Sequence, residues 1–259
     1  MPFAPPDRMI TVAGQLADAA RPIILEHFRS GIAIEDKPDD SPVTKADQGA
    51  EAAMRELIRS HLPDHGIVGE EYGTEKGEAD WLWVLDPIDG TRAFITGNPL
   101  FGTLIGLLYK GEPVLGVIDS PYLQERWLGV SDRPTTLNGQ PVTTSSCNEL
   151  AAARMQSTSP SMFSNEDLPT FERLASTVRD VRYGGDCYCY GLLALGGVDL
   201  VCENSMNPYD FLALAPVVAG AGGVITNWQG DPLSLSSGPS VLASANPALH
   251  ALALAQVKA

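Results

Sequence analysis

The chain of 259 residues has few cysteines, few histidines and few aromatic side chains. There are four residues each of Cys and His, and Phe, Trp and Tyr make only 7% of the sequence. Cys187 and Cys189 are separated by one residue, which is not the usual zinc-ligand spacing, and no histidine lies near them. The histidines also lie apart from the acidic motifs described below. We therefore expect reduced, mostly buried thiols, and neither a histidine-based zinc site nor a Ser-His-Asp triad.

Long apolar runs and positive charges are scarce as well. No stretch reaches the roughly 18 apolar residues of a membrane span, and residues 1–7 contain no apolar segment of signal-peptide length. Asp and Glu outnumber Lys and Arg by 32 to 17, which gives a formal net charge of -15. A nucleic-acid groove or an anionic membrane surface would need clustered Lys and Arg. These absences predict a cytoplasmic globular protein that binds neither nucleic acid nor membrane.

The first part of the chain has the pattern of two helices followed by a sheet. Apolar residues at helical spacing predict a helix over 8–30, which Pro22 should kink or interrupt. A capping sequence at 44–47 predicts a second helix that ends near Pro63. The following segments predict a largely antiparallel sheet, with a hairpin turn at Asn138-Gly139 and strands over 66–68, 81–85, 103–109, 113–118 and 126–130.

The second part of the chain alternates strands and helices, which predicts an α/β layer. We expect the boundary near residues 145–155, and so an N-terminal metal-binding part over 1–150 and a C-terminal part over 151–259 that completes the substrate site. The expected strands are 154–157, 198–203, 224–228 and 241–244, and the expected helices are 168–178, 187–195, 208–220 and 247–257.

An acidic run at 86–91, Asp-Pro-Ile-Asp-Gly-Thr, follows an apolar stretch. Asp86 and Asp89 are three residues apart, so a regular strand would point them to opposite faces of a sheet. Pro87 disfavours a regular strand, and a turn there would bring both carboxylates and the Ile88 carbonyl to one side. Mg²⁺ prefers oxygen ligands and keeps several waters, so it needs a few converging carboxylates. The run therefore predicts a divalent cation that holds a phosphate.

Three further groups can join this run. Glu70, in the pair Glu70-Glu71, ends a short strand. Gly90 and Thr91 would open a helix whose free N–H groups and positive dipole end receive a phosphate, while the Thr91 hydroxyl could orient a water. Asp210 would lie near another helix N-terminus and face the site. Asp89-Gly90-Thr91 alone also fits an ordinary capping turn, and Asp210 alone fits an ordinary acidic residue in a first helical turn, but together with Glu70-Glu71 and the rest of the run they predict a metal–phosphate site.

With these motifs the chain resembles the inositol monophosphatase-like superfamily of Mg²⁺-dependent, lithium-sensitive phosphatases. The resemblance covers nearly the full length, and Glu70-Glu71, the run at 86–91 and Asp210 stand in the expected order at similar separations. Tyr209 departs from the pattern, because many relatives have Trp there. The resemblance implies an α/β fold of the layered sugar-phosphatase type, an αβαβα sandwich, and a homodimer.

The roles of individual residues follow from this resemblance. Asp47 and Thr91 would polarise the attacking water, and Glu71 would support catalysis from the outer metal shell. The N–H groups of Gly90 and Thr91 would hold the phosphate, and Lys37 could approach the phosphate or a third metal. Such metal-activated water needs no histidine and no covalent phospho-enzyme. Two or three Mg²⁺ ions would be bound by five groups: Glu70, Asp86, the Ile88 carbonyl, Asp89 and Asp210.

The nature of the ester is predicted from the segment before the helix at 187–195. Carboxylates at Asp186 and Glu203 would favour a cationic leaving group, and histidinol phosphate carries an amine and an imidazole. Arg182 could reach the substrate or a partner subunit, although a surface role fits it equally well. Asp186 by itself also fits a helix N-cap. The expected substrate-binding residues are Gly90, Thr91, Arg182, Gly185, Asp186, Glu203 and Asp210.

Three functions remain open on these grounds. The favoured one is a histidinol-phosphatase of histidine biosynthesis, which hydrolyses L-histidinol phosphate to L-histidinol and phosphate, because residues 86–94, 185–188 and 207–211 resemble that branch. The alternative is an inositol-1-monophosphatase or a broad monophosphatase. A substrate with two phosphates would ask for more Lys and Arg. A non-catalytic partner of the RNA machinery is the alternative of another class, and the acidic charge and full ligand set disfavour it.

Overall fold

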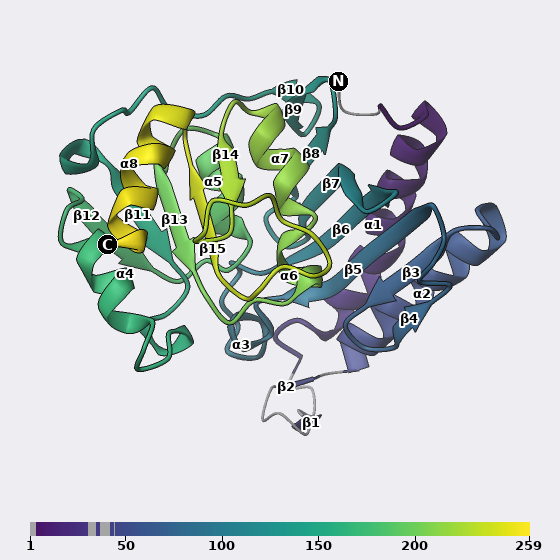
Figure 1. Ribbon diagram of the computed structural model, residues 1–259. Coiled ribbons are helices and arrows are strands. Elements are labelled where there is room, and N and C mark those ends of the chain that lie inside the picture. Colours follow the sequence, from purple (N-terminus) through teal and green to yellow (C-terminus); the bar gives the residue numbers. More distant parts are fainter. Residues whose placement is uncertain (1–3, 31–34, 37–41, 44) are drawn as a thin grey trace.

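The computed structural model describes residues 4–30, 35–36, 42–43 and 45–259. Among these residues, layers of helices alternate with two large sheets (Figure 1): two N-terminal helices, an eight-stranded sheet, short inner helices, a five-stranded sheet and two outer helices. This order confirms the αβαβα sandwich expected from the sequence. Lys37, which could approach the phosphate, lies outside the described residues.

Helices α1 (Asp7–His27) and α2 (Lys45–His61) cover one face of the larger sheet. Pro22 lies inside α1 and does not interrupt it, so the expected interruption was wrong. Pro22 removes the hydrogen bond to the carbonyl of Asp18, and both residues lie on the exposed face of the helix. Water can therefore satisfy that carbonyl, while Leu16 and Ile24 keep the opposite face in the core.

The larger sheet has the strand order β10-β9-β8-β7-β6-β5-β3-β4 and is antiparallel except where β3 meets β5. The largely antiparallel sheet predicted from the sequence is thus confirmed. The hairpin turn at Asn138-Gly139 is found between β9 and β10, but β4, β9 and β10 were not given as strands, because they are short, mostly exposed and without apolar alternation. The bounds are β3 (Gly66–Gly69), β4 (Gly73–Glu75), β5 (Trp81–Asp89), β6 (Gly102–Tyr109), β7 (Glu112–Ser120), β8 (Glu125–Val130), β9 (Arg133–Leu137) and β10 (Gln140–Pro141); β1 (Glu35–Asp36) and β2 (Pro42–Val43) pair separately.

The smaller sheet has the order β12-β11-β13-β15-β14 and mixes both strand directions. β11 runs parallel to β12 and β13, whereas β15 runs antiparallel to β13 and β14. The alternation of strands and helices predicted for this part is confirmed, with the unpredicted edge strand β12 added. The bounds are β11 (Arg154–Ser157), β12 (Asp180–Tyr183), β13 (Leu200–Glu203), β14 (Val224–Thr226) and β15 (Val241–Ser244).

Three short helices fill the space between the sheets: α5 (Tyr188–Ala194), α6 (Pro208–Phe211) and α7 (Leu214–Gly220). A single helix over 208–220 was predicted and is wrong. Pro216 has no N–H to donate to the carbonyl of Leu212, so the helical hydrogen bonding is interrupted between α6 and α7, although Leu212 and Ala213 keep helical backbone angles. A Cβ at Gly116 of β7 would overlap the backbone carbonyl of Ala213. Only glycine therefore allows the start of α7 to approach the larger sheet so closely.

The inner helices join the two parts of the chain in one core cluster, which contains Leu82 and Val84 of β5 together with Val241 and Ala243 of β15. A division between residues 1–150 and 151–259 remains a proposal. On the outer side, α4 (Leu168–Ala175) and α8 (Pro247–Lys258) pack on the smaller sheet, and the remaining helical turns are α3 (Thr91–Ile95), η1 (Leu150–Ala152) and η2 (Pro160–Met162). None of the helices in the described ranges is long and apolar enough to cross a membrane.

Buried His250 makes the stability of this outer layer depend on pH. Its two ring nitrogens lie 2.9 Å from the hydroxyls of Thr226 and Ser244. Burial, followed by the charge of Lys258, lowers the pKa of His250 to about 4. Since an unfolded histidine titrates near 6.5, only the unfolded state takes up this proton between the two values. The contribution of neutral His250 to the free energy of unfolding is therefore complete above about pH 6.5 and is lost as the pH falls toward about 4.

We therefore expect His250 to lower the free energy of unfolding by about 3 kcal/mol between pH 6.5 and pH 4. Urea titrations of wild type and His250→Gln at several pH values measure this effect. The difference between the two proteins in how the free energy of unfolding changes with pH separates the effect of His250 from that of the carboxylates. Parallel pH dependences for the two proteins would show that His250 is not the group responsible.

Candidate metal and phosphate site

β5 contains a β-bulge at the acidic run. On the neighbouring strand β6, Leu104 pairs with Asp86 and Gly102 pairs with Asp89, so two residues of β5 stand where β6 has one. Leu104 and Gly102 are two residues apart and face the same side of the sheet. The bulge therefore places Asp86 and Asp89 on that side too. The expectation that both carboxylates reach one side is confirmed, although through a bulge within the strand.

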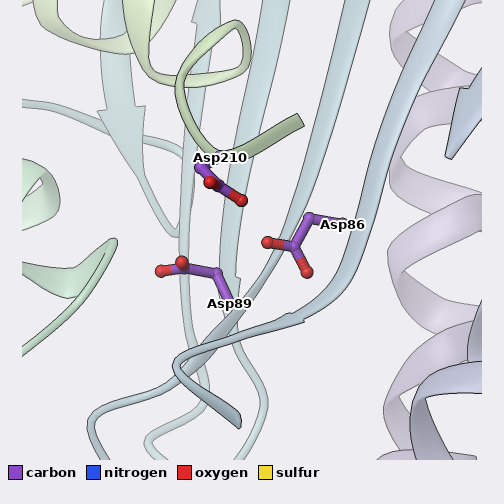
Figure 2. Close-up of side chains that lie close together, drawn as sticks. All are labelled: Asp86, Asp89 and Asp210. Carbon is purple, nitrogen blue, oxygen red and sulfur yellow. The ribbon is translucent and has the colours of Figure 1, made fainter. Parts of the chain in front are cut away.

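Asp210 completes a group of three carboxylates, which point toward one another in Figure 2. One oxygen from each of Asp86, Asp89 and Asp210 lies within 4.8 Å of the others. Asp210 belongs to the first turn of α6, and its Oδ2 accepts the N–H of Asn207 at 2.6 Å. Oδ2 of Asp89 accepts the N–H of Cys187 at 2.5 Å. The inner helices thus orient two of the three carboxylates.

These carboxylates carry the signature of a cation site. Burial, with Glu70 nearby, raises the pKa of Asp86. Burial and the charge of Asp210 raise the pKa of Asp89 to about 8, and burial raises the pKa of Asp210 to about 7. Among the described residues, Oδ1 of Asp86 is buried without a hydrogen-bond partner. A divalent cation would offset the charge and occupy this oxygen, so the donor set fits Mg²⁺.

Gly90 and Thr91 follow the bulge directly. Gly90 adopts a left-handed conformation, with φ of 84°, and is the N-cap residue of α3. The Thr91 hydroxyl donates a hydrogen bond of 3.0 Å to the Ile88 carbonyl. This bond leaves lone pairs on the Thr91 oxygen, which can accept a hydrogen bond from a water.

Glu70 and Glu71 lie on the turn between β3 and β4, which a buried side chain of α2 organises. Glu51 accepts the N–H of Glu71 at 2.7 Å and the N–H of Tyr72 at 3.2 Å. Its other partner is Arg55, at 2.7 Å, and the Arg55 guanidinium also donates to the carbonyl of Gly73. The buried pair thus fixes the turn that carries Glu70, and sequence reasoning missed it because the two residues fit an ordinary helix pair.

A cleft of about 630 Å³ opens over the carboxylates. Both parts of the chain line it: from the predicted site it contains Glu70, Asp86, Ile88, Asp89, Gly90, Thr91, Gly185, Asp186 and Asp210. Sequence reasoning missed other lining residues, including Asn98, Thr158 and Ser161, which are small polar residues outside any motif. The acidic run and the segment around Asp186 are thus brought together, as expected.

Asp186 lies directly against the acidic run. A Cβ built on Gly90 would be 2.8 Å from Cγ of Asp186. Asp186 has a φ of 44°, a strained conformation for most residues other than glycine, and it does not cap α5, whose N-cap is Cys187. Burial and the charge of Asp89 raise the pKa of Asp186 to about 8. The placement brings a fifth acidic side chain to the cleft, beside Glu70, Asp86, Asp89 and Asp210.

Four predicted site residues are not among the lining of the cleft, as far as the structure describes the chain. Asp47 is buried in the first turn of α2, and Glu71 is half-buried beside Glu70. Arg182 is exposed on the edge strand β12. The structure therefore does not place Arg182 among the residues that line the cleft with the carboxylates.

Glu203 is likewise set behind the cleft and not within it. It is 2% exposed, and its two carboxylate oxygens are both engaged. Oε1 accepts the N–H of Thr158 at 2.9 Å and its hydroxyl at 2.6 Å, and Oε2 accepts the hydroxyl of Tyr190 at 2.8 Å. The expected direct contact of Glu203 with substrate does not fit these bonds. Glu203 instead holds Thr158, which does line the cleft.

Comparison with known proteins finds a matching family and similar sequences. The model of a family described as "Inositol monophosphatase family" matches residues 6–259. The "Bifunctional phosphatase IMPL2, chloroplastic" of Arabidopsis thaliana is 51% identical over 240 residues, which are 92% of this chain and 69% of the relative. A "Histidinol-phosphatase" of Chlorobaculum parvum is 35% identical over 226 residues, or 85% of this chain and 86% of the relative.

A solved structure is also similar over almost its whole length. An inositol monophosphatase from Zymomonas mobilis has a TM-score of 0.91 and 47% sequence identity to this chain, and the match covers 98% of each chain. The layered fold and the placement of the two sheets are therefore shared with a solved phosphatase structure.

Proposed function

Because the chain belongs to the inositol monophosphatase family, we propose that it is a Mg²⁺-dependent phosphate monoester hydrolase with histidinol phosphate as its preferred substrate. The observation that carries the substrate choice is the position of Asp186, which adds a further acidic side chain to the cleft beside the metal carboxylates. Its pKa of about 8 would fall when a cation or a protonated amine binds beside it, and it would then carry a negative charge. The relative named as a histidinol-phosphatase supports the same substrate.

The acidic cluster would hold the metal. Glu70, Asp86, Asp89, Asp210 and the Ile88 carbonyl provide oxygen ligands for two or three Mg²⁺ ions. Bound Mg²⁺ lowers the pKa of a coordinated water and stabilises charge on the attacking and leaving oxygens. The protein keeps its ligands in place before metal arrives, because Cys187 and Asn207 already hold Asp89 and Asp210 through backbone N–H groups.

Residues around the cluster would position the water and the phosphate. Thr91 donates its hydroxyl hydrogen bond to the Ile88 carbonyl, so its oxygen can accept a hydrogen bond from the attacking water and would orient the lone pair of that water. Asp47 would share this task, and Glu71 would support the metal ligands from outside. The N–H groups of Gly90 and Thr91 would bind phosphate oxygens at the start of α3. These assignments extend the family resemblance to single residues.

The substrate preference follows from charge. Histidinol is released with an amine that is protonated near neutral pH, whereas inositol is a neutral polyol. A carboxylate in a cleft that excludes much of the solvent attracts the amine strongly, because Coulomb interactions weaken less there than in water. Asp186 would therefore contact the amine, with Gly185 giving space in the same loop. Glu203 would act indirectly through Thr158.

An inositol-1-monophosphatase or a broad monophosphatase is the second candidate. The similarity to the Zymomonas mobilis inositol monophosphatase favours it. The metal site alone does not separate these two functions, because it recognises the phosphate that both esters share.

Parallel kinetics on the two esters test the proposal. With Mg²⁺ in excess, kcat/KM for L-histidinol phosphate should exceed that for inositol 1-phosphate by at least about tenfold, roughly the effect of one favourable charge contact. The reverse preference would favour the second candidate. Failure to release phosphate from any monoester would contradict both and favour a non-catalytic partner of the RNA machinery.

The proposal includes the setting of the enzyme as the sequence suggested it: a homodimer in the cytoplasm that acts on a small phosphate ester. Arg182 and Tyr183, exposed on the edge strand β12, are available to a partner subunit. Sedimentation equilibrium of the purified protein would measure the subunit number directly.

A further inference from the structure

We propose that Thr103 is a positioning residue that closes the bulge in β5 and so holds Asp86 and Asp89 as a pair of cation ligands. Thr103 belongs to β6 and is not among the residues that line the cleft. The inference rests on the proposed function, because it concerns the binding of the metal that the proposed reaction needs.

The strand pairing makes Thr103 the residue opposite the bulge. Asp86 pairs with Leu104 and Asp89 pairs with Gly102, which leaves Thr103 facing both Pro87 and Ile88. A regular ladder would pair residues one to one and would send Asp89 to the other face of the sheet. The common orientation of the two carboxylates thus depends on the extra residue that the bulge accommodates.

A buried hydrogen bond fastens the bulge at this point. The hydroxyl of Thr103 donates to the Pro87 carbonyl at 2.8 Å, and Thr103 is 1% exposed. A bulge leaves one residue outside the ladder, and a buried carbonyl without a donor is costly. The hydroxyl thus gives the Pro87 carbonyl a buried side-chain donor besides the backbone ladder, which stabilises the bulged conformation.

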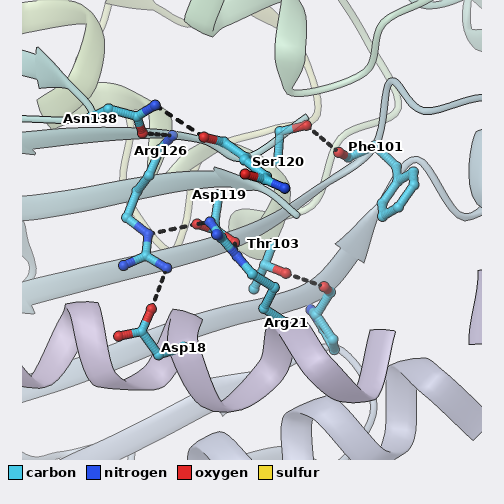
Figure 3. Close-up of polar contacts among 10 residues, drawn as sticks. Asp18, Arg21, Phe101, Thr103, Asp119, Ser120, Arg126 and Asn138 are labelled. Atoms are coloured by element: carbon cyan, nitrogen blue, oxygen red, sulfur yellow. Dashed lines mark hydrogen bonds and ion pairs between the residues drawn. The ribbon is translucent and has the colours of Figure 1, made fainter. Parts of the chain in front are cut away.

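The strand that carries Thr103 is itself held firmly. Asp119 on β7 pairs with Thr103 across the ladder and is fully buried. Arg21 of α1 and Arg126 of β8 both bind its carboxylate at 2.6 Å, and Arg126 also binds Asp18 (Figure 3). These ion pairs hold Asp119 and the neighbouring Thr103 in place. We therefore infer that Thr103 determines the conformation of the bulge.

The surroundings of Gly102, the residue that pairs with Asp89, also restrict the position of Asp89. A Cβ at Gly102 would lie 2.7 Å from Sγ of Cys187 and 3.1 Å from the carbonyl of Asp119. The N–H of the same Cys187 binds Asp89. Thr103 fixes the backbone before Asp89, and Cys187 fixes its carboxylate, so both ends of the short segment are held.

Matched variants can separate a positioning role from a contribution to folding alone. Thr103→Val removes the hydroxyl at nearly constant volume, and Thr103→Ser keeps it. Thr135→Val is the control, because the Thr135 hydroxyl makes a similar buried bond, of 2.7 Å, to the Val217 carbonyl. Thr103→Ala repeats the loss of the hydroxyl if Thr103→Val does not fold.

The measurement is the affinity of the substrate-free protein for Mn²⁺, followed through the electron paramagnetic resonance signal of the free ion. Mn²⁺ suits the same carboxylate and carbonyl ligands as Mg²⁺. We expect Thr103→Val to weaken binding by about 10- to 100-fold, the usual effect of losing a group that orients metal ligands. Thr103→Ser and Thr135→Val should bind Mn²⁺ as wild type does, while both Val variants melt at lower temperature.

Two outcomes would count against the inference in different ways. If Thr103→Val binds Mn²⁺ as tightly as Thr135→Val and loses only thermal stability, Thr103 is a structural residue and the inference is overturned while the proposed function stands. If the wild-type protein itself does not bind Mn²⁺ or Mg²⁺, the proposed function fails first, and the role of Thr103 toward a cation fails with it.

Discussion

Replacing Asp89 by Asn is expected to lower kcat by on the order of 10³-fold, comparable to the loss of one preorganised electrostatic group. Oδ2 of Asp89 is already committed to the N–H of Cys187. If the amide oxygen of Asn keeps that bond, its NH₂ group points at the metal and offers no lone pair. If the amide turns over, its NH₂ group opposes the N–H of Cys187. Neither orientation preserves a cation ligand.

Unlike its activity, the thermal stability of metal-free Asp89→Asn should not decrease. In the metal-free protein, burial and the charge of Asp210 disfavour an ionised Asp89. Asn carries no charge at any pH, so the melting temperature of Asp89→Asn in EDTA should exceed that of wild type above about pH 8, where Asp89 ionises. Phosphate release with excess Mg²⁺ and thermal melting in EDTA measure the two effects.

Asp80→Asn is a suitable control, because Asp80 is an exposed carboxylate whose ion pair with Lys110 spans 3.9 Å. It should change neither activity nor metal binding. Near-normal turnover by Asp89→Asn would contradict the assignment of Asp89 as a metal ligand, whatever its melting temperature.

Asp186→Asn is expected to lower kcat/KM for histidinol phosphate by about 10²-fold, in the range found when one partner of a buried charge pair is truncated. The effect on inositol 1-phosphate should be small, because that leaving group has no positive charge. Asn keeps the size of the side chain and tolerates the left-handed conformation of residue 186. The variant therefore tests the charge and not the backbone.

The two esters must be compared in the same preparation. Asp180→Asn, on the exposed edge strand β12, is the control for a general loss of negative charge. Equal losses on both esters would show that Asp186 serves the metal cluster, which it approaches through Asp89. In that case the specificity for a cationic leaving group would have to come from elsewhere in the cleft.

The metal carboxylates could be predicted from sequence because their signal is local. Asp86 and Asp89 stand in one short run, and Pro87 between them already excludes a regular strand. Even so, the sequence suggested a turn, whereas the structure has a bulge within β5. The difference arises because the bulge is defined by pairing with β6, and pairing register is a property of two strands that a single segment does not reveal.

Residues that support the site from a distance were not predicted. Glu51 fixes the turn carrying Glu70, and its backbone partners lie far from it in sequence. Glu203 gave the opposite error, because a carboxylate at a strand end was expected to meet substrate, but Thr158 and Tyr190 occupy its oxygens. Whether an acidic side chain is free or engaged depends on neighbours that only the folded chain brings together.

The tight contact at Gly116 extends the functional site well beyond the residues that meet substrate. It seats Ala213 against the larger sheet just after Asp210, while the same sheet carries Asp86 and Asp89. Any side chain at position 116 would push the third carboxylate away from the other two. In a survey of tolerated substitutions, this glycine would therefore be as intolerant as the carboxylates themselves. Positions sensitive to mutation would therefore include residues that pack the layers together, as well as residues that take part in the reaction.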